Sequence, residues 1–136
     1  MCLCLALRAD ESPRVEVNLV QETPVLDGSL NDSCWAELPV VKGFIQRRPN
    51  EGMAETEKTE VRLCRDAKIL YVGVRCFDSQ PDKIRAGVMQ RDAPVRGDDY
   101  FFILIDPFSR GRDGYYFRTN ANGAKGEALI LSLIHI

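Results

Sequence analysis

Turn-forming residues interrupt this chain of 136 residues at short intervals, and this spacing is the feature that most limits its fold. Short runs of β-branched and aromatic residues lie between the turns, as β-strands require. A single short turn of helix is expected, ending near Trp35, and no longer helical pattern occurs. The sequence therefore predicts an all-β fold, an antiparallel β-sandwich of jelly-roll-like type.

The clearest predicted element is a hairpin made of residues 59–64 and residues 69–77. Apolar and polar side chains alternate in both segments, and the polar stretch 65–68 between them is suited to a turn. We expect one face of this hairpin to lie in the core. The apolar residues on that face are expected to be Val61, Leu63, Leu70, Val72, Val74 and Cys76.

The most apolar stretch is Tyr100–Ile105, which predicts a central strand buried on both faces. Asp106 and Pro107 end it, because proline has no N–H group to donate to a sheet. A partner strand is expected at residues 115–120. Further short strands are predicted at residues 15–20, 44–46 and 127–131.

Composition limits the classes of function. Hydrophobic residues make up 45% of the chain and charged residues 28%, as in one ordinary globular domain. The formal net charge of -2 gives no basic field for nucleic acid. No apolar run approaches the roughly 20 residues that span a bilayer as a helix. We therefore expect neither a nucleic-acid partner nor a transmembrane segment.

Three of the five cysteines, Cys34, Cys64 and Cys76, lie in the body of the chain. Cys64 and Cys76 fall on the two predicted hairpin strands, too far out of register for a disulfide. No spacing of cysteine and histidine suggests a zinc site, and the only histidine is His135. We expect the three thiols to be buried and inert.

The two ends differ from the rest of the sequence. Residues 1–9 are largely apolar and lead into a polar stretch, as at the end of a secretory signal peptide. The alternative is an apolar tail or edge strand that packs on the domain. Residues 131–136 form an apolar segment that resembles translated sequencing-adapter sequence. We expect a secreted domain at residues 10–130 that is truncated at its C-terminal end and carries a non-native tail.

Three segments together share the pattern of a known family. They are Thr23–Gly28 with Asn31, Asp32 and Trp35; Thr59–Leu63 with Leu70–Val74; and Asp98–Asp99 with Phe102–Asp106 and Gly114–Arg118. In order and spacing they resemble carbohydrate-binding module family 9. They resemble still more closely the variant domain at the N-terminus of bacterial proteins that continue into an outer-membrane β-barrel. The resemblance covers residues 24–127 and implies an antiparallel β-sandwich.

The resemblance also implies sugar-binding residues. Family members clamp a terminal sugar between two tryptophans, while charged side chains bond its hydroxyls. The family's binding arginine corresponds to Arg118. One clamp tryptophan is replaced by Arg96, whose guanidinium can stack on a sugar face, and a family glutamate is replaced by Phe102. Tyr115 and Tyr116 point to opposite faces of one strand, so one is expected in the core and the other on a binding surface.

Acidic residues suggest two further kinds of site. Asp98, Asp99 and Asp106 are candidate calcium ligands, since some family members bind calcium through such oxygens. The alternative is that they are solvated carboxylates at strand ends. Glu57 and Glu60 lie on opposite faces, three positions apart, and do not make a glycosidase pair across a cleft. No catalytic activity is expected.

The function predicted is that of a non-catalytic carbohydrate-binding module serving a larger polysaccharide-processing or cell-envelope protein. Its partner would be a polysaccharide or oligosaccharide, and its location secreted, periplasmic or outer-membrane-associated. The alternative is a periplasmic structural or interaction domain that no longer binds sugar and docks to a covalently linked β-barrel domain. Arg118 favours the first function, whereas Arg96 and Phe102 favour the second. Trp35 is expected to be a core residue rather than a sugar platform.

Overall fold

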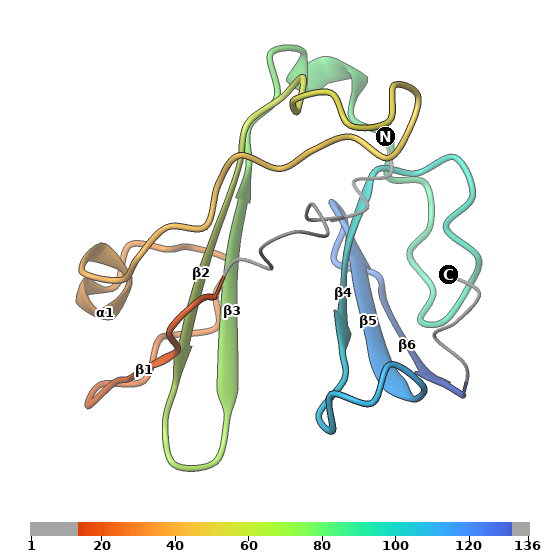
Figure 1. The fold of residues 1–136 in the computed structure, drawn as a ribbon. Coiled ribbons are helices and arrows are strands. Elements are labelled where there is room, and N and C mark those ends of the chain that lie inside the picture. Colours follow the sequence, from red (N-terminus) through yellow and green to blue (C-terminus); the bar gives the residue numbers. More distant parts are fainter. Residues whose placement is uncertain (1–13, 132–136) are drawn as a thin grey trace. The chain divides into compact units, whose positions relative to one another are not determined.

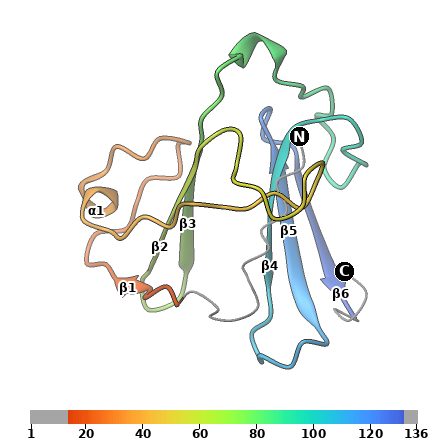
Figure 2. The ribbon, with the colours of Figure 1, turned by 45° about the horizontal axis from the view of Figure 1, so that its top comes forward.

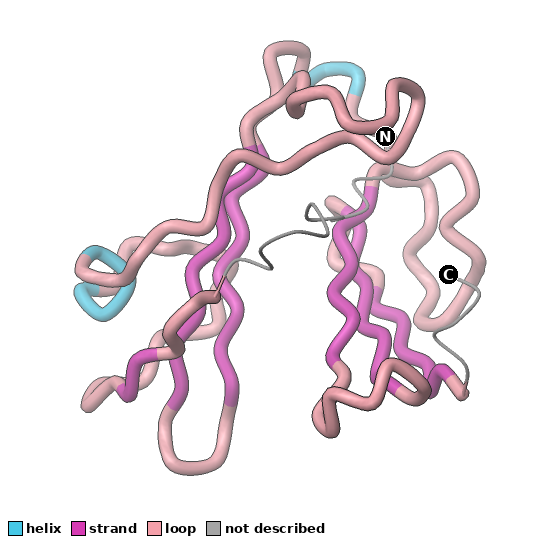
Figure 3. Tube along the Cα trace, viewed as in Figure 1, coloured by secondary structure: helices cyan, strands magenta, loops and turns pink. Residues whose placement is uncertain are grey.

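A computed structural model describes residues 14–131, which consist almost entirely of strands and loops (Figures 1 and 3). The described residues divide into two compact units, 14–79 and 80–131. The predicted leader at residues 1–9 and the predicted tail beyond residue 131 lie outside the described residues. Each unit contains one three-stranded sheet.

The sheet of residues 14–79 is built on the predicted hairpin. Strand β2 (Thr59–Arg65) pairs antiparallel with β3 (Leu70–Cys76), and β1 (Asn18–Leu19) lies parallel to β2. The Asp66 carboxylate closes the turn between β2 and β3 by accepting hydrogen bonds from the backbone N–H groups of Lys68 and Ile69. The predicted hairpin is therefore confirmed, with its ends shifted by one residue.

The core of this unit lies on the face of the hairpin opposite to the predicted one. The buried side chains are Trp35, from helix α1 (Ser33–Ala36), with Leu38, Cys64 and Tyr71. Trp35 packs directly over Gly73, where an added Cβ would lie 3.0 Å from the indole ring and 2.8 Å from Leu30. The predicted face, with Leu63, Val72 and Val74, is only half-buried apart from Val61, and Leu70 and Cys76 are exposed.

The register also settles the positions of the cysteines. Cys64 lies opposite Tyr71 and Cys76 lies opposite Thr59, at different ends of the hairpin, and all three described cysteines are free thiols. Cys64 is fully buried, and burial raises the pKa of its thiol. Cys76, however, is exposed rather than buried, as are its neighbours Arg75 and Phe77 at the end of β3.

The two short strands predicted near the N-terminus are largely replaced by loop. The first is reduced to the two residues of β1, and the second to a single bridge between Ile45 and Ala54. Phe44 is nevertheless buried, with 2% of its surface exposed. A buried side chain can hold such a segment in place without a full ladder of backbone hydrogen bonds.

Residues 80–131 begin with a short 3-10 turn (Pro81–Lys83), followed by a long loop to residue 99 and then three strands. The strands β4 (Tyr100–Ile105), β5 (Gly114–Asn120) and β6 (Lys125–Ile130) form an antiparallel meander in that order (Figure 2). The prediction that residues 100–105 form a central strand is wrong, because β5 holds the centre of this sheet. All six β4 residues are half-buried.

The all-β fold is confirmed, because both sheets consist mainly of antiparallel strands and the helices are single turns. Face-to-face packing of the sheets as a sandwich stays a prediction. Among residues 14–131, the structure contains no helix with the length and apolar character needed to cross a membrane.

Candidate functional site

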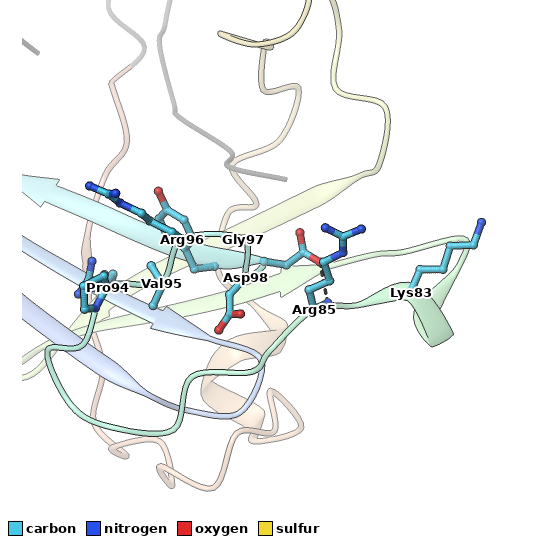
Figure 4. A pocket seen from close by; sticks show the side chains of 10 residues that line it. Lys83, Arg85, Pro94, Val95, Arg96, Gly97 and Asp98 are labelled. Carbon is cyan, nitrogen blue, oxygen red and sulfur yellow. Dashed lines mark hydrogen bonds between the residues drawn. The ribbon is translucent and has the colours of Figure 1, made fainter.

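An open cleft of about 700 Å³ lies in residues 80–131, beside the start of β4. It contains both arginines predicted to bind sugar, Arg96 and Arg118, which lie 22 positions apart in the sequence. The complete lining consists of Lys83, Arg85, Pro94, Val95, Arg96, Gly97, Asp98, Asp99, Tyr100 and Arg118 (Figure 4). We take this cleft as the candidate site because it brings the two arginines together.

A tight turn displays Arg96. The Asp98 N–H donates to the Val95 carbonyl at 3.1 Å, which closes a four-residue turn. Gly97, the third residue of the turn, has a φ of +89°, a conformation that this turn type requires and that glycine adopts without strain. Val95, the first residue of the turn, is buried, while Arg96, the second, is exposed. The turn therefore fixes the backbone of Arg96 and leaves its side chain available.

A buried amide ties the loop before β4 to the sheet. Asn120, at the end of β5, donates from Nδ2 to the Val88 carbonyl at 2.7 Å and to Asp98 Oδ2 at 2.9 Å. Asp98 also accepts from the N–H groups of Gly87 and Val88, at 3.0 and 2.9 Å. These hydrogen bonds, led by that from Val88, lower the pKa of the Asp98 carboxyl because they favour its charged form.

A second pair of hydrogen bonds holds the loop at Arg85, on the wall of the cleft. The Asp99 N–H donates to the Arg85 carbonyl at 2.7 Å, and the Arg85 N–H donates to Asp99 Oδ2 at 2.9 Å. This reciprocal pair joins Arg85 to the last loop residue before β4, and Figure 4 shows the second of these hydrogen bonds. The backbone of Arg85 is thus fixed while its guanidinium extends away.

Arg118 lies in the middle strand β5, opposite Phe102 on β4 and Gly126 on β6. Its Nη2 donates to the Ala93 carbonyl at 2.9 Å and to the Asp92 carbonyl at 3.3 Å. Its side chain crosses Gly126 so closely that a Cβ there would overlap Nε and lie 3.1 Å from Cγ. Half-buried and held by two carbonyls, Arg118 presents a fixed guanidinium rather than a mobile one.

The two tyrosines predicted with these arginines do not line the cleft. Tyr116 shares a sheet face with Arg118, is half-buried, and its ring lies 5.3 Å from that of Phe102. Tyr115 is on the opposite face and 48% exposed. The alternation of the two rings is confirmed, but their role in the cleft is not supported by their positions.

The three predicted calcium ligands do not form one site. Asp98 and Asp99 precede β4, whereas Asp106 follows its last residue, about 20 Å away for a strand of this length. Asp106 instead accepts from the N–H groups of Phe108 and Gly111, at 3.0 and 2.7 Å, which lowers its pKa. Between residues 14 and 131 the structure contains no cluster of three or more side chains suited to a metal.

Sequence reasoning missed three residues of this site. Lys83 and Arg85 reach the cleft because the loop folds back to β4, which the local sequence does not indicate. The close approach at Gly126 could have been predicted from the sequence, since a glycine inside a strand often marks the close approach of another group. The predicted strand began only after it, at residue 127.

The charges of the cleft are predominantly positive. Four cationic side chains line it, Lys83, Arg85, Arg96 and Arg118, against the two carboxylates Asp98 and Asp99. The ion pairs found among residues 14–131 involve none of these four cations at 4.0 Å or less. The described chain is thus an all-β protein with an open, cationic cleft at one sheet end.

Comparison with family models, with curated proteins and with solved structures gives no match for this chain.

Proposed function

We propose that the chain is a non-catalytic carbohydrate-binding module and that its ligand occupies the cleft between Arg96 and Arg118. The single observation that carries the proposal is that these two arginines, chosen from the sequence pattern, line one open cleft. The module would serve a larger polysaccharide-processing or cell-envelope protein, secreted or periplasmic, with a polysaccharide or oligosaccharide as partner.

The chemistry of the cleft fits sugar recognition. A sugar presents hydroxyl groups that need directed donors and acceptors, and an apolar face that packs on a flat group. Arg118 uses Nη2 for the two backbone carbonyls, so its Nη1 hydrogens remain for a ligand hydroxyl. Arg96 is exposed at the tip of its turn, where a planar guanidinium can lie against a sugar ring.

An interaction domain without sugar binding is the second candidate, and a different surface favours it. One face of the sheet of residues 100–130 exposes large apolar side chains: Tyr115 at 48%, Phe117 at 41% and Leu129 at 58%. Alternate positions on paired strands place them on one side. Exposed apolar groups gathered in this way are typical of a docking surface.

Affinity electrophoresis through gels that contain soluble polysaccharides tests the first proposal. We expect the chain to be retarded by at least one neutral or acidic plant or microbial glycan. Arg118→Ala should reduce that retardation, because a charged hydrogen bond contributes roughly 1.5–3 kcal/mol. Arg112→Ala is the matched control, since Arg112 is an exposed arginine in the turn between β4 and β5, outside the cleft.

Two results would overturn the sugar-binding proposal. One is the absence of retardation in every glycan gel while the protein remains folded. The other is equal loss of retardation in Arg112→Ala and Arg118→Ala. If Phe117→Ser reduces the retardation and Arg118→Ala does not, the docking surface is favoured over the cleft.

A further inference from the structure

The cleft has a charge pattern that a neutral sugar does not need. It carries an excess of two positive charges over its carboxylates, in a chain whose formal net charge is -2. Local charge thus opposes the charge of the whole chain. A concave site in which cations outnumber carboxylates two to one attracts an anionic ligand.

The two carboxylates of the cleft are hydrogen-bonded to the protein, and the positive charge of Arg85 acts on Asp99. Both oxygens of Asp98 accept hydrogen bonds from the protein, two from backbone N–H groups and one from Asn120. Asp99 Oδ2 accepts from the backbone N–H of Arg85. In Figure 4 the Asp98 carboxylate points to one side of the chain, whereas Lys83, Arg85 and Arg96 extend to the other.

Aromatic residues contribute little to the cleft. Tyr100 is the one aromatic side chain in its lining. Stacking on aromatic rings is a main source of affinity for the apolar faces of neutral sugars. A cleft with four cations and a single ring must obtain most of its affinity from charge-assisted hydrogen bonds instead.

We propose that the ligand is an acidic carbohydrate, a glycan bearing the carboxylates of uronic acid residues, held by Arg96 and Arg118 with Lys83 and Arg85 at the cleft wall. This inference rests on the proposed carbohydrate-binding function and names its ligand class. Arginine guanidinium groups are planar forks that pair with a carboxylate through two parallel hydrogen bonds. Arg118 is held in place by the backbone, and Arg96 is displayed by its turn, so one fixed and one adjustable guanidinium meet the ligand.

Titration calorimetry with matched oligosaccharides tests the charge requirement. The probes are an oligogalacturonate, its fully methyl-esterified form and a neutral xylo-oligosaccharide. We expect the oligogalacturonate to bind about tenfold or more tightly than its ester, as the loss of one charged hydrogen bond implies. Raising the salt concentration should weaken the binding of the oligogalacturonate but leave the affinity for its ester nearly unchanged.

Two variants locate the effect. Arg96→Gln and Lys83→Gln should each reduce the preference for the acid over its ester, because they remove cleft cations but keep polar side chains. Arg112→Gln serves as the control and should preserve the preference, since it removes the same charge outside the cleft. Circular dichroism confirms that each variant is folded.

The outcomes separate this inference from the function on which it rests. Equal affinity for acid, ester and neutral oligosaccharide would overturn the acidic-ligand inference but support sugar binding. Binding to none of the three, together with no retardation in any glycan gel, would overturn both. Equally tight binding of a sulfated non-carbohydrate polymer such as polyvinyl sulfate would also overturn the inference, because it would show attraction to any polyanion.

Discussion

At the scale of single residues, the cleft depends on positions that have no ligand role of their own. Gly126 is the clearest, because its missing side chain leaves the space that the Arg118 side chain crosses. Asn120 is another, since its amide joins the loop before β4 to β5 and to the turn before β6. Gly126 thus leaves room for the Arg118 side chain, and Asn120 holds the loop that carries Asp98.

Gly126→Ala tests this dependence without changing any charge. The new Cβ would overlap Arg118, so the guanidinium must shift away from the Ala93 carbonyl. We expect the affinity for the retained glycan to fall about tenfold, the loss of one charged hydrogen bond, in calorimetric titration. Unchanged affinity in a variant of normal thermal stability would contradict the role given to this glycine.

Asp98 makes a prediction about pH. Its pKa is lowered from the ordinary value of 3.8 in the folded chain, mainly by the Val88 N–H, then by Asn120 and the Gly87 N–H. A lowered folded pKa contributes stability above the unfolded value that is lost as the pH falls through the folded value. Asp98→Asn should therefore unfold more easily near neutral pH and lose less stability on acidification. Parallel pH profiles in urea unfolding of the two proteins would contradict this.

At the scale of elements, the hairpin shows what sequence patterns determine. Alternation and the Asp66 turn predicted the pairing of β2 with β3 correctly. The buried face was mispredicted because it carries charged residues, Glu60, Arg62 and Arg75, beside Cys64 and Tyr71, so alternation favoured the more apolar face. What covers the hairpin is the segment of Leu30 and Trp35, and no local pattern in residues 59–77 reveals this.

The contact between α1 and β3 gives a stability prediction. At Gly73 a Cβ would lie 2.8 Å from Leu30 and 3.0 Å from Trp35, so Gly73→Ala overpacks the core. We expect a loss of roughly 1–3 kcal/mol in the free energy of unfolding by urea. Gly87→Ala is the matched control, since its Cβ would meet only Asp98 Oδ1, at an ordinary 3.6 Å. Equal stability of the two variants would contradict the close packing of Trp35 on β3.

The site shows a similar division between what sequence predicts and what it does not. Arg96 and Arg118 were singled out because each occupies a position of a spaced pattern, Arg118 as the family's arginine and Arg96 in place of a tryptophan. Lys83 and Arg85 were not, since they reach the cleft only through the hydrogen bonds between Arg85 and Asp99. Asp106 was wrongly grouped with Asp98 and Asp99 because strand length, which separates them, was not weighed against their shared acidity.

At the scale of the whole molecule, the predicted sandwich concerns how the two sheets stabilise each other. A three-stranded sheet with one covered face is a small folding unit, and its other apolar face needs burial. The hairpin face that carries Val61, Leu63, Val72 and Val74 is such an apolar face, half-buried apart from Val61, and further burial would stabilise it. Such burial would couple the unfolding of both units.

Unfolding in urea tests this coupling with two signals. Trp35, the only tryptophan, reports by fluorescence on residues 14–79, whereas circular dichroism reports on the strands of both units. If the sheets pack together, we expect both signals to change in one coincident transition. Two separate midpoints would show that the units unfold independently and would contradict the sandwich.

The central claim, that the cleft between Arg96 and Arg118 binds carbohydrate, is tested most directly by a map of backbone amide chemical shifts during titration with oligogalacturonate and xylo-oligosaccharide. The account predicts that the perturbed amides cluster at residues 95–100 and at Arg118, with little change around Tyr115 and Leu129. An absence of perturbation with both sugars, or a cluster of shifts on the Tyr115 face, would contradict it.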